Sequence, residues 1–208
     1  MKTFWLFAGL IVTVFSASCQ DFEGKIVYKK NFMLKNKAAV NHLNEAMGTR
    51  EEYFIKNVNY KSIMDGKELQ WQLYINKDNR IYHKYAQSAT IFFTDASIKD
   101  DEILGTKLTK NVIEILGYSC DELILTTKSG IQKYYFSQKF PVNSNAFSRH
   151  RFGNYSDYIT IAGAIPLKMI FENNQFIEER IAIEISPLLL NDKEFMLPAN
   201  IAIEPISL

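Results

Sequence analysis

The sequence is poor in the residues that build small cross-linked or loop-rich proteins. It has 2 Cys, 9 Gly and 5 Pro in 208 residues. Two cysteines exclude a disulfide-rich scaffold and a four-cysteine zinc site. Neither sign of charge is in excess, since 24 Lys and Arg face 23 Asp and Glu, a formal net charge of +1. We therefore expect no nucleic-acid partner, because such proteins favour a basic excess.

The motifs of common catalytic and cofactor sites are also missing. The chain has no Gly-x-Ser-x-Gly elbow, no Walker sequence and no Gly-x-Gly-x-x-Gly loop. His42, His83 and His150 lack the spacing of a metal site, and the acidic residues at 95 and 100–102 do not match a calcium-binding loop. We predict a non-enzymatic protein that uses no metal and no cofactor.

The N-terminal segment has the three regions of a secretory signal. Lys2 precedes an apolar run from Phe4 to Phe15, and the small residues 16–18 lead to Cys19. The run is shorter than the roughly 20 residues that span a membrane. Residues 1–19 are therefore predicted to be a signal peptide, and 20–208 a single domain that is exported to the periplasm or the outer membrane. Two routes stay open: cleavage near Cys19, or acylation of Cys19, which alone would attach the protein to a membrane.

Alternation of apolar and polar residues dominates the predicted domain and indicates antiparallel strands with one buried face. The clearest cases are 69–75, 165–171 and 177–185. The content of 11 Tyr and 15 Phe also favours strands. Further strands are predicted at 22–30, 51–64, 80–87, 90–95, 118–127 and 131–137.

One segment follows a helical period instead. Between Asn36 and Gly48, apolar residues recur at steps of three and four, so the principal helix is predicted over 36–48. A second short helix over 154–162 competes with the β-prone stretch Tyr158–Ile161. The fold class is therefore mainly β (α+β): a curved antiparallel sheet with helix 36–48 packed on its concave face.

Such a sheet leaves room for an apolar cavity between helix and strands. Trp71 shares its parity with three aliphatic residues and is expected to point inward, with Gln72 toward water. The residues expected to line the cavity are Leu69, Trp71, Leu73, Ile75, Tyr85 and Phe93. The alternative is that these side chains fill a solid core.

Three further positions have their own predictions. Cys120 lies on an apolar parity and is expected to be a small buried side chain without a disulfide partner. His83 is expected to be a buried histidine with its hydrogen bonds satisfied. The group 149–151, which is Arg-His-Arg, is either a solvated turn or a contact for an anionic head group or a partner.

The order of motifs resembles a known family. The motifs are 21–28 (DFEGKIVY), 60–62 (YKS), 115–120 (ILGYSC), 163–167 (GAIPL) and 192–198 (DKEFMLP). Together they look like uncharacterised exported proteins of the Bacteroidetes group, which are similar to the lipoprotein-carrier superfamily of LolA, LolB and the mycobacterial lipid-binding lipoproteins. The resemblance implies an open half-barrel with a helical lid, a cavity for acyl chains and no catalytic residues.

These observations predict an exported envelope protein that binds or carries a lipid or another apolar ligand. The alternative is a structural or interaction protein of the cell envelope, with a solid core, no ligand and an envelope protein as its partner.

Overall fold

The computed structural model describes residues 20–36 and 40–206. The predicted signal peptide, with Cys19, lies outside the described residues. Within those residues, none of the helices combines the length and the apolar character needed to cross a membrane.

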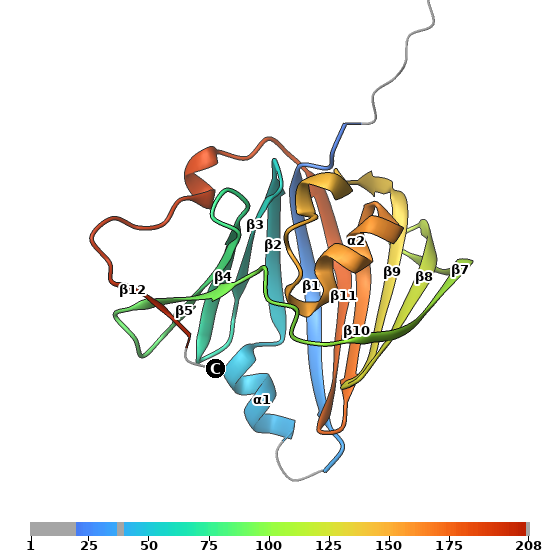
Figure 1. Ribbon diagram of the computed structural model, residues 1–208, viewed down its shortest axis with the longest axis horizontal. Helices are drawn as coiled ribbons and strands as arrows, with labels where there is room; N and C mark the ends of the chain where they lie inside the picture. The colour runs from blue at the N-terminus through green and yellow to red at the C-terminus, as the bar shows by residue number, and fades with distance from the viewer. Residues whose placement is uncertain (1–19, 37–39, 207–208) are drawn as a thin grey trace, which may run out of the picture.

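The described chain forms one curved sheet of 12 strands (Figure 1). The strand order across it is β12-β6-β5-β4-β3-β2-β1-β11-β10-β9-β8-β7. The strands are β1 (Gly24–Leu34), β2 (Arg50–Lys56), β3 (Asn59–Met64), β4 (Leu69–Ile75), β5 (Arg80–Tyr85), β6 (Ile91–Asp95), β7 (Ile103–Ile115), β8 (Tyr118–Thr127), β9 (Gly130–Pro141), β10 (Ala164–Asn173), β11 (Phe176–Pro187) and β12 (Ile203–Pro205).

The sheet is open, because its outer strands β7 and β12 do not pair with each other. Adjacent strands are antiparallel throughout, except that β12 runs parallel to β6. The predicted class, a mainly β, curved and open antiparallel sheet, is confirmed. The first strand lies in the middle of the sheet, where β1 pairs with β11 from Gly24 opposite Pro187 to Leu34 opposite Phe176.

The principal predicted helix is present as α1 (Val40–Met47). It joins β1 to the neighbouring β2, so it lies at one end of the sheet. There the Asn44 side chain accepts from the Phe32 amide at 2.8 Å, and the Ala46 carbonyl oxygen accepts from the amide of Glu68 after β3. The position predicted for this helix was the concave face.

The concave face is covered by a second helix, α2 (Tyr155–Ala162), with the short helices η1 (Ser144–Phe147) and η2 (Phe152–Asn154) before it (Figure 1). Of the two alternatives for 154–162, the helix is therefore the one observed. The β6–β7 connection crosses this side and is held there, because the Ala96 carbonyl oxygen accepts from the amides of Arg151 and Phe152 at 2.7 and 3.0 Å.

Two strand predictions differ from the structure. The segment 51–64 is a hairpin, because Asn57 and Val58 have positive φ angles of 46° and 64° and form a two-residue turn between β2 and β3. The long strand β7 was absent from the prediction. It is an edge strand with mostly exposed residues, so it lacks the alternation that marks a half-buried strand.

The buried apolar side chains form two clusters on opposite faces. The inner cluster lies between the concave face and α2 and includes Ile26, Tyr74, Leu125, Phe136, Phe147, Tyr158 and Leu167. The outer cluster lies under the C-terminal segment 188–202 and consists of Leu73, Tyr82, Ile91, Leu190 and Phe195, with Trp71, Ile75 and Phe93 against it. Strand β4 therefore contributes to both clusters and is covered on both faces.

Candidate ligand cavity on the concave face

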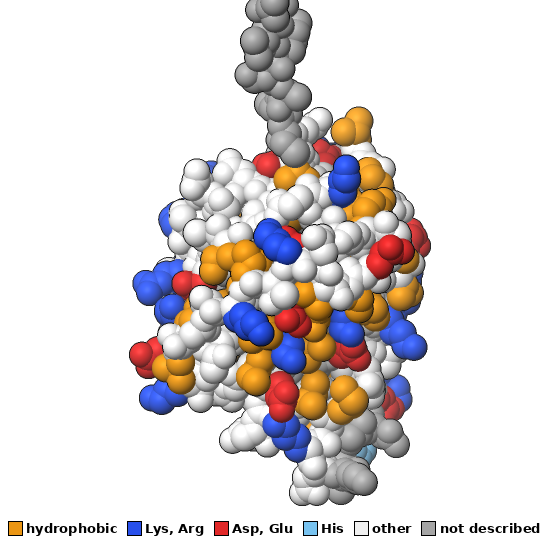
Figure 2. All heavy atoms as spheres, turned by 90° about the vertical axis from the view of Figure 1, so that its right-hand side faces the viewer, with side chains coloured by type: hydrophobic (Ala, Val, Ile, Leu, Met, Phe, Trp, Pro, Cys, Tyr) orange, Lys and Arg blue, Asp and Glu red, His pale blue; other side chains and the backbone are white. Residues whose placement is uncertain are grey.

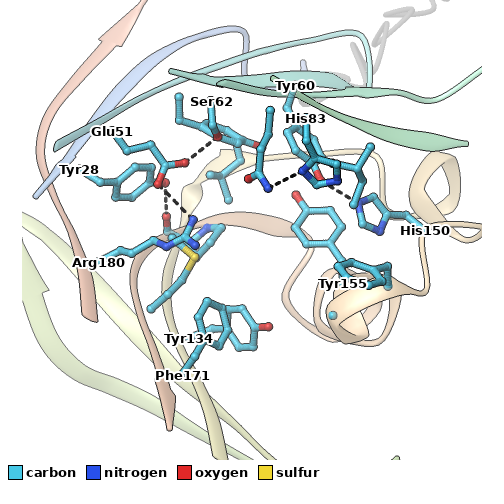
Figure 3. Close-up of a pocket in the computed structure, with 18 residues that line it drawn as sticks. Tyr28, Glu51, Tyr60, Ser62, His83, Tyr134, His150, Tyr155, Phe171 and Arg180 are labelled. Carbon is cyan, nitrogen blue, oxygen red and sulfur yellow. Dashed lines mark hydrogen bonds and ion pairs between the residues drawn. The ribbon is translucent and has the colours of Figure 1, made fainter. Parts of the chain in front are cut away.

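A cavity of about 280 Å³ lies in the inner cluster, between the concave face and α2 (Figure 3). Strands β1 to β5 line one side, β9 to β11 line another, and the segment 150–155 closes it. Its walls are mainly aromatic and aliphatic, but they include polar groups at two places. One place is a charged group at β2 and β11, and the other is a pair of histidines.

Aromatic side chains from β2, β3 and α2 form one wall, and Tyr74 of β4 stacks on this group without lining the cavity. Tyr60 lies at the centre, with its ring centroid 5.5 Å from that of Tyr53 and 5.1 Å from that of Tyr74, both in stacked orientation. His150 and Tyr155 pack on the same group, 4.7 Å apart. Tyr134, Met169, Phe171 and Ile165 form the opposite wall.

The charged group consists of Lys30, Glu51, Glu178 and Arg180. The Arg180 guanidinium bonds Glu51 at 3.1 Å and Glu178 at 2.6 Å, and the Lys30 ammonium lies 4.0 and 3.7 Å from the same two carboxylates. Ser62 donates to Glu51 at 2.6 Å. Four neighbouring strands, β3, β2, β1 and β11, bring these side chains together on the concave face. The two positive and two negative charges balance, and this pairing offsets the free-energy cost of removing the charged groups from water.

The pKa values of the group reflect its mutual pairing. Burial raises the pKa of Glu51, but Arg180 and Lys30 outweigh it and hold that pKa below its usual value. Burial lowers the pKa of Arg180, but Glu178 and Glu51 outweigh it and raise the pKa above its usual value. For Lys30, burial and Arg180 lower the pKa, and the two carboxylates offset only part of this.

Two buried histidines face the cavity from the other side. His83 lies between Gln72, 3.0 Å from Nδ1, and Thr94, 3.0 Å from Nε2, so both of its ring nitrogens have partners. His150 is 2% exposed and its Nε2 lies 2.7 Å from the Tyr60 hydroxyl. Burial lowers the pKa of each histidine to about 4, so both are neutral at pH 7.

Four buried side-chain polar atoms have no good partner among the described residues. Two belong to Asn154, which does not line the cavity, and the other two belong to the cavity residues His150 and Tyr155. The Nδ1 of His150 makes no hydrogen bond to another residue. The Tyr155 hydroxyl makes none of ordinary geometry, although Tyr53 lies beside it, and burial raises the Tyr155 pKa to about 12. By contrast, the Tyr28 hydroxyl donates to the Pro166 carbonyl oxygen at 2.6 Å. Buried polar atoms without partners are rare in native structures and call for an explanation.

The residues predicted to line a cavity lie elsewhere. Leu73 belongs to the outer cluster, and Trp71, Ile75 and Phe93 pack against it. Leu69 is buried and Tyr85 is half-buried, but neither lines this cavity. The reason is that β4 is covered on both faces. Its aliphatic parity faces the C-terminal segment, whereas Gln72, which we expected to face water, lines the cavity.

The single-residue predictions have different outcomes. Cys120 is buried and free, as predicted, and burial raises its pKa to about 11. His83 is buried and fully bonded, also as predicted. In the group 149–151, Arg149 and Arg151 are exposed, whereas His150 is buried in the cavity wall. The predictions for this group treated all three residues as exposed, so they are wrong for His150.

No family model and no curated protein matches the chain. Among solved structures, it is similar to an uncharacterized conserved protein from Thermus thermophilus, at a TM-score of 0.50 and 6% identity over 89% of this chain and 91% of that chain. It is also similar to PNGF-II, at a TM-score of 0.51 and 12% identity over 89% of this chain but only 32% of that chain. At these identities the similarity concerns the fold alone.

A third similar structure is a LolA superfamily protein, NE2245 from Nitrosomonas europaea. The match covers 86% of this chain and 91% of that chain, at 10% identity and a TM-score of 0.40. This likeness is too distant to support a functional comparison. The predicted relation to exported Bacteroidetes proteins stays a prediction.

Proposed function

We propose that the protein is a non-catalytic binding protein that holds a small, largely apolar ligand in the concave cavity. The observation that carries this proposal is the cavity itself, which has aromatic and aliphatic walls and two buried polar atoms without partners. Ligand sites in proteins are mostly apolar, with a few placed polar groups that fix orientation. A close-packed core would leave no such space.

The size of the cavity limits the ligand. Its volume of about 280 Å³ is at the lower end of ligand pockets, which run from about 300 Å³ upward. We therefore propose a single acyl chain or a molecule of one or two rings, rather than a lipid with several chains.

The test starts with what the protein carries. Protein purified without detergent from its native host is extracted, and the extract is compared by mass spectrometry with that of a Met169→Trp variant. Met169 lines the cavity, so the larger ring should fill it and reduce the amount of ligand. Ile183→Trp is the matched control, because Ile183 lies on the same sheet but is exposed. Equal extracts from all three proteins, or no bound molecule in any, would contradict the proposal.

Export is part of the proposal, with the periplasm or the outer membrane as the location. It is supported by the signal-like sequence of residues 1–19. Intact-mass measurement of the native protein tests it. A mature chain that begins at Cys19 or Gln20 is expected, and a diacyl or triacyl increment on Cys19 would select the lipoprotein route. Retention of Met1 would contradict export.

An interaction protein of the envelope is the second candidate function, and strand β7 favours it. This strand is an open edge of the sheet, and its exposed residues include Leu104, Leu108 and Val112. Figure 2 shows this side of the molecule, where apolar side chains lie among charged ones. An exposed strand edge can pair with a strand of another protein. A ligand-free extract together with partner binding that Leu108→Lys abolishes would favour this function.

A further inference from the structure

We infer that the cavity selects an uncharged amphipathic molecule, such as a primary amide or an alcohol with a hydrocarbon tail, over the matching carboxylate. The inference rests on the proposed function, because it specifies the chemistry of the ligand in that same cavity. Three features of the walls carry it: a charge balance that is already complete, a pair of unpaired polar atoms, and an apolar wall opposite them.

The charge balance argues against an anionic ligand. Glu51 and Arg180 are the only charged side chains in the cavity wall, as far as the described residues show. The Arg180 guanidinium already bonds two carboxylates, Glu51 at 3.1 Å and Glu178 at 2.6 Å. A ligand carboxylate that bound Arg180 would therefore have to displace one of them or lie beside it. Either arrangement sets three negative charges against the two positive charges of Arg180 and Lys30, and an excess buried negative charge is costly.

The rest of the polar wall offers no other positive charge. His83 has both ring nitrogens bonded, and His150 is 2% exposed and held against Tyr60. Protonation of either would place a charge in an apolar setting. Neutral histidines provide one donor and one acceptor each, which suits a neutral polar group.

The unpaired atoms indicate where that polar group lies. The Tyr155 hydroxyl points into the cavity between the charged group and the histidines (Figure 3). The other atom is the Nδ1 of His150, whose ring is 4.7 Å from that of Tyr155. A hydroxyl both donates and accepts, whereas the imidazole nitrogen does one or the other according to its tautomer. An amide or alcohol of the ligand can satisfy both atoms, because it also donates and accepts.

The tail of the ligand has an apolar wall to contact. Tyr134 and Phe171 lie on the other side of the cavity in Figure 3, with their ring centroids 5.5 Å apart. Met169 and Ile165 extend this wall. Burial of hydrocarbon there supplies binding energy, while the polar group near Tyr155 supplies orientation.

Matched small ligands test the inference. Octanamide, octanol and octanoate share one tail and differ in the head group, so calorimetric titration of each at neutral pH isolates the head. We expect the amide and the alcohol to bind at least about tenfold more tightly than octanoate, because the carboxylate adds a buried negative charge to a group whose charges already balance.

Three variants locate the effect. Tyr155→Phe removes only the hydroxyl and should weaken octanamide about three- to tenfold, as the loss of one hydrogen bond does. Tyr85→Phe makes the same change outside the cavity and should leave all three affinities unchanged. Glu51→Gln frees Arg180 from one carboxylate and should tighten octanoate binding relative to octanamide.

The outcomes separate the two proposals. Octanoate binding equal to or tighter than octanamide, or unchanged octanamide binding in Tyr155→Phe, overturns this inference and leaves the cavity as a binding site. Binding of none of the three ligands by the wild-type protein overturns the proposed function and this inference with it.

Discussion

At the scale of single residues, the buried histidines link folding to pH. In an unfolded chain a histidine has a pKa near 6.5, whereas burial lowers the pKa of His83 and His150 to about 4. Between these two values the unfolded state binds more protons than the folded state. The histidine contribution to stability is therefore constant above about pH 6.5 and falls as the pH drops toward 4.

We predict that the free energy of unfolding falls by about 1.4 kcal/mol per pH unit for each of these histidines across that window. Chemical denaturation between pH 7 and pH 4.5 measures it. His150→Gln should remove one histidine's share of the slope. His42→Gln changes an exposed histidine of α1 and should leave the slope as it is. An identical slope in wild type and His150→Gln would contradict the prediction.

The charged group gives a second prediction from two neighbouring residues. Glu51→Ala leaves Arg180 and Lys30 with one carboxylate, so it should cost about 3–5 kcal/mol of stability. Glu52→Ala removes only a surface pair with Arg50 and should cost about 0–1 kcal/mol. Equal losses, measured by denaturant unfolding, would show that the buried group does not act as a unit.

At the scale of the elements, the C-terminal segment acts as a cover for the outer face of β4 and β5. Leu190 is 8% exposed in the outer cluster, whereas its neighbour Leu189 is 89% exposed. Leu190→Ala should cost about 2–5 kcal/mol, as buried leucines do. Leu189→Ala should change stability by no more than about 0.5 kcal/mol. Thermal and denaturant unfolding of the two variants compare them directly, and similar values would mean that the segment is not packed there.

The β7–β8 turn offers a stabilising change. Leu116 and Gly117 form its two central residues with positive φ angles of 52° and 80°, and Leu116 is 46% exposed. A leucine at positive φ is strained, and asparagine adopts this conformation more readily. Leu116→Asn should raise stability by about 1 kcal/mol. Leu104→Asn replaces an exposed leucine within β7 and should give no such gain when the two variants are compared by denaturant unfolding.

The sequence predicted the elements better than it predicted which face each side chain occupies. The alternation at 69–75 correctly indicates a strand with buried aliphatic residues. When both faces of a strand are covered, however, a period of two cannot show which set of side chains faces the concave side of the sheet and which faces the outer side. The C-terminal segment that covers β4 is distant in sequence. The polar and aromatic residues that share one strand face, Tyr60 with Ser62 on β3 and Gln72 on β4, were the available signal for the cavity.

At the scale of the whole molecule, the rate at which the Cys120 thiol is modified measures how often the protein unfolds globally. A chain that starts at Gln20 contains no other cysteine. Because Cys120 is buried and its pKa is raised to about 11, a thiol reagent at pH 8 should modify it only as fast as the protein unfolds. Ser119→Cys places an exposed thiol on the same strand and should react at once. Rapid modification of Cys120 in the native protein would show local opening around β8.

The position of β1 in the middle of the sheet affects how the chain folds during its synthesis. During synthesis, the edge of β1 that later pairs with β11 stays unpaired until residues 176–187 have been made. At 5–20 residues per second, this delay is about 8–30 s. The nascent N-terminal half therefore presents an apolar, unprotected strand edge while it is still attached to the ribosome, the state in which strands associate wrongly. Chaperones that hold nascent chains would be needed most during that interval.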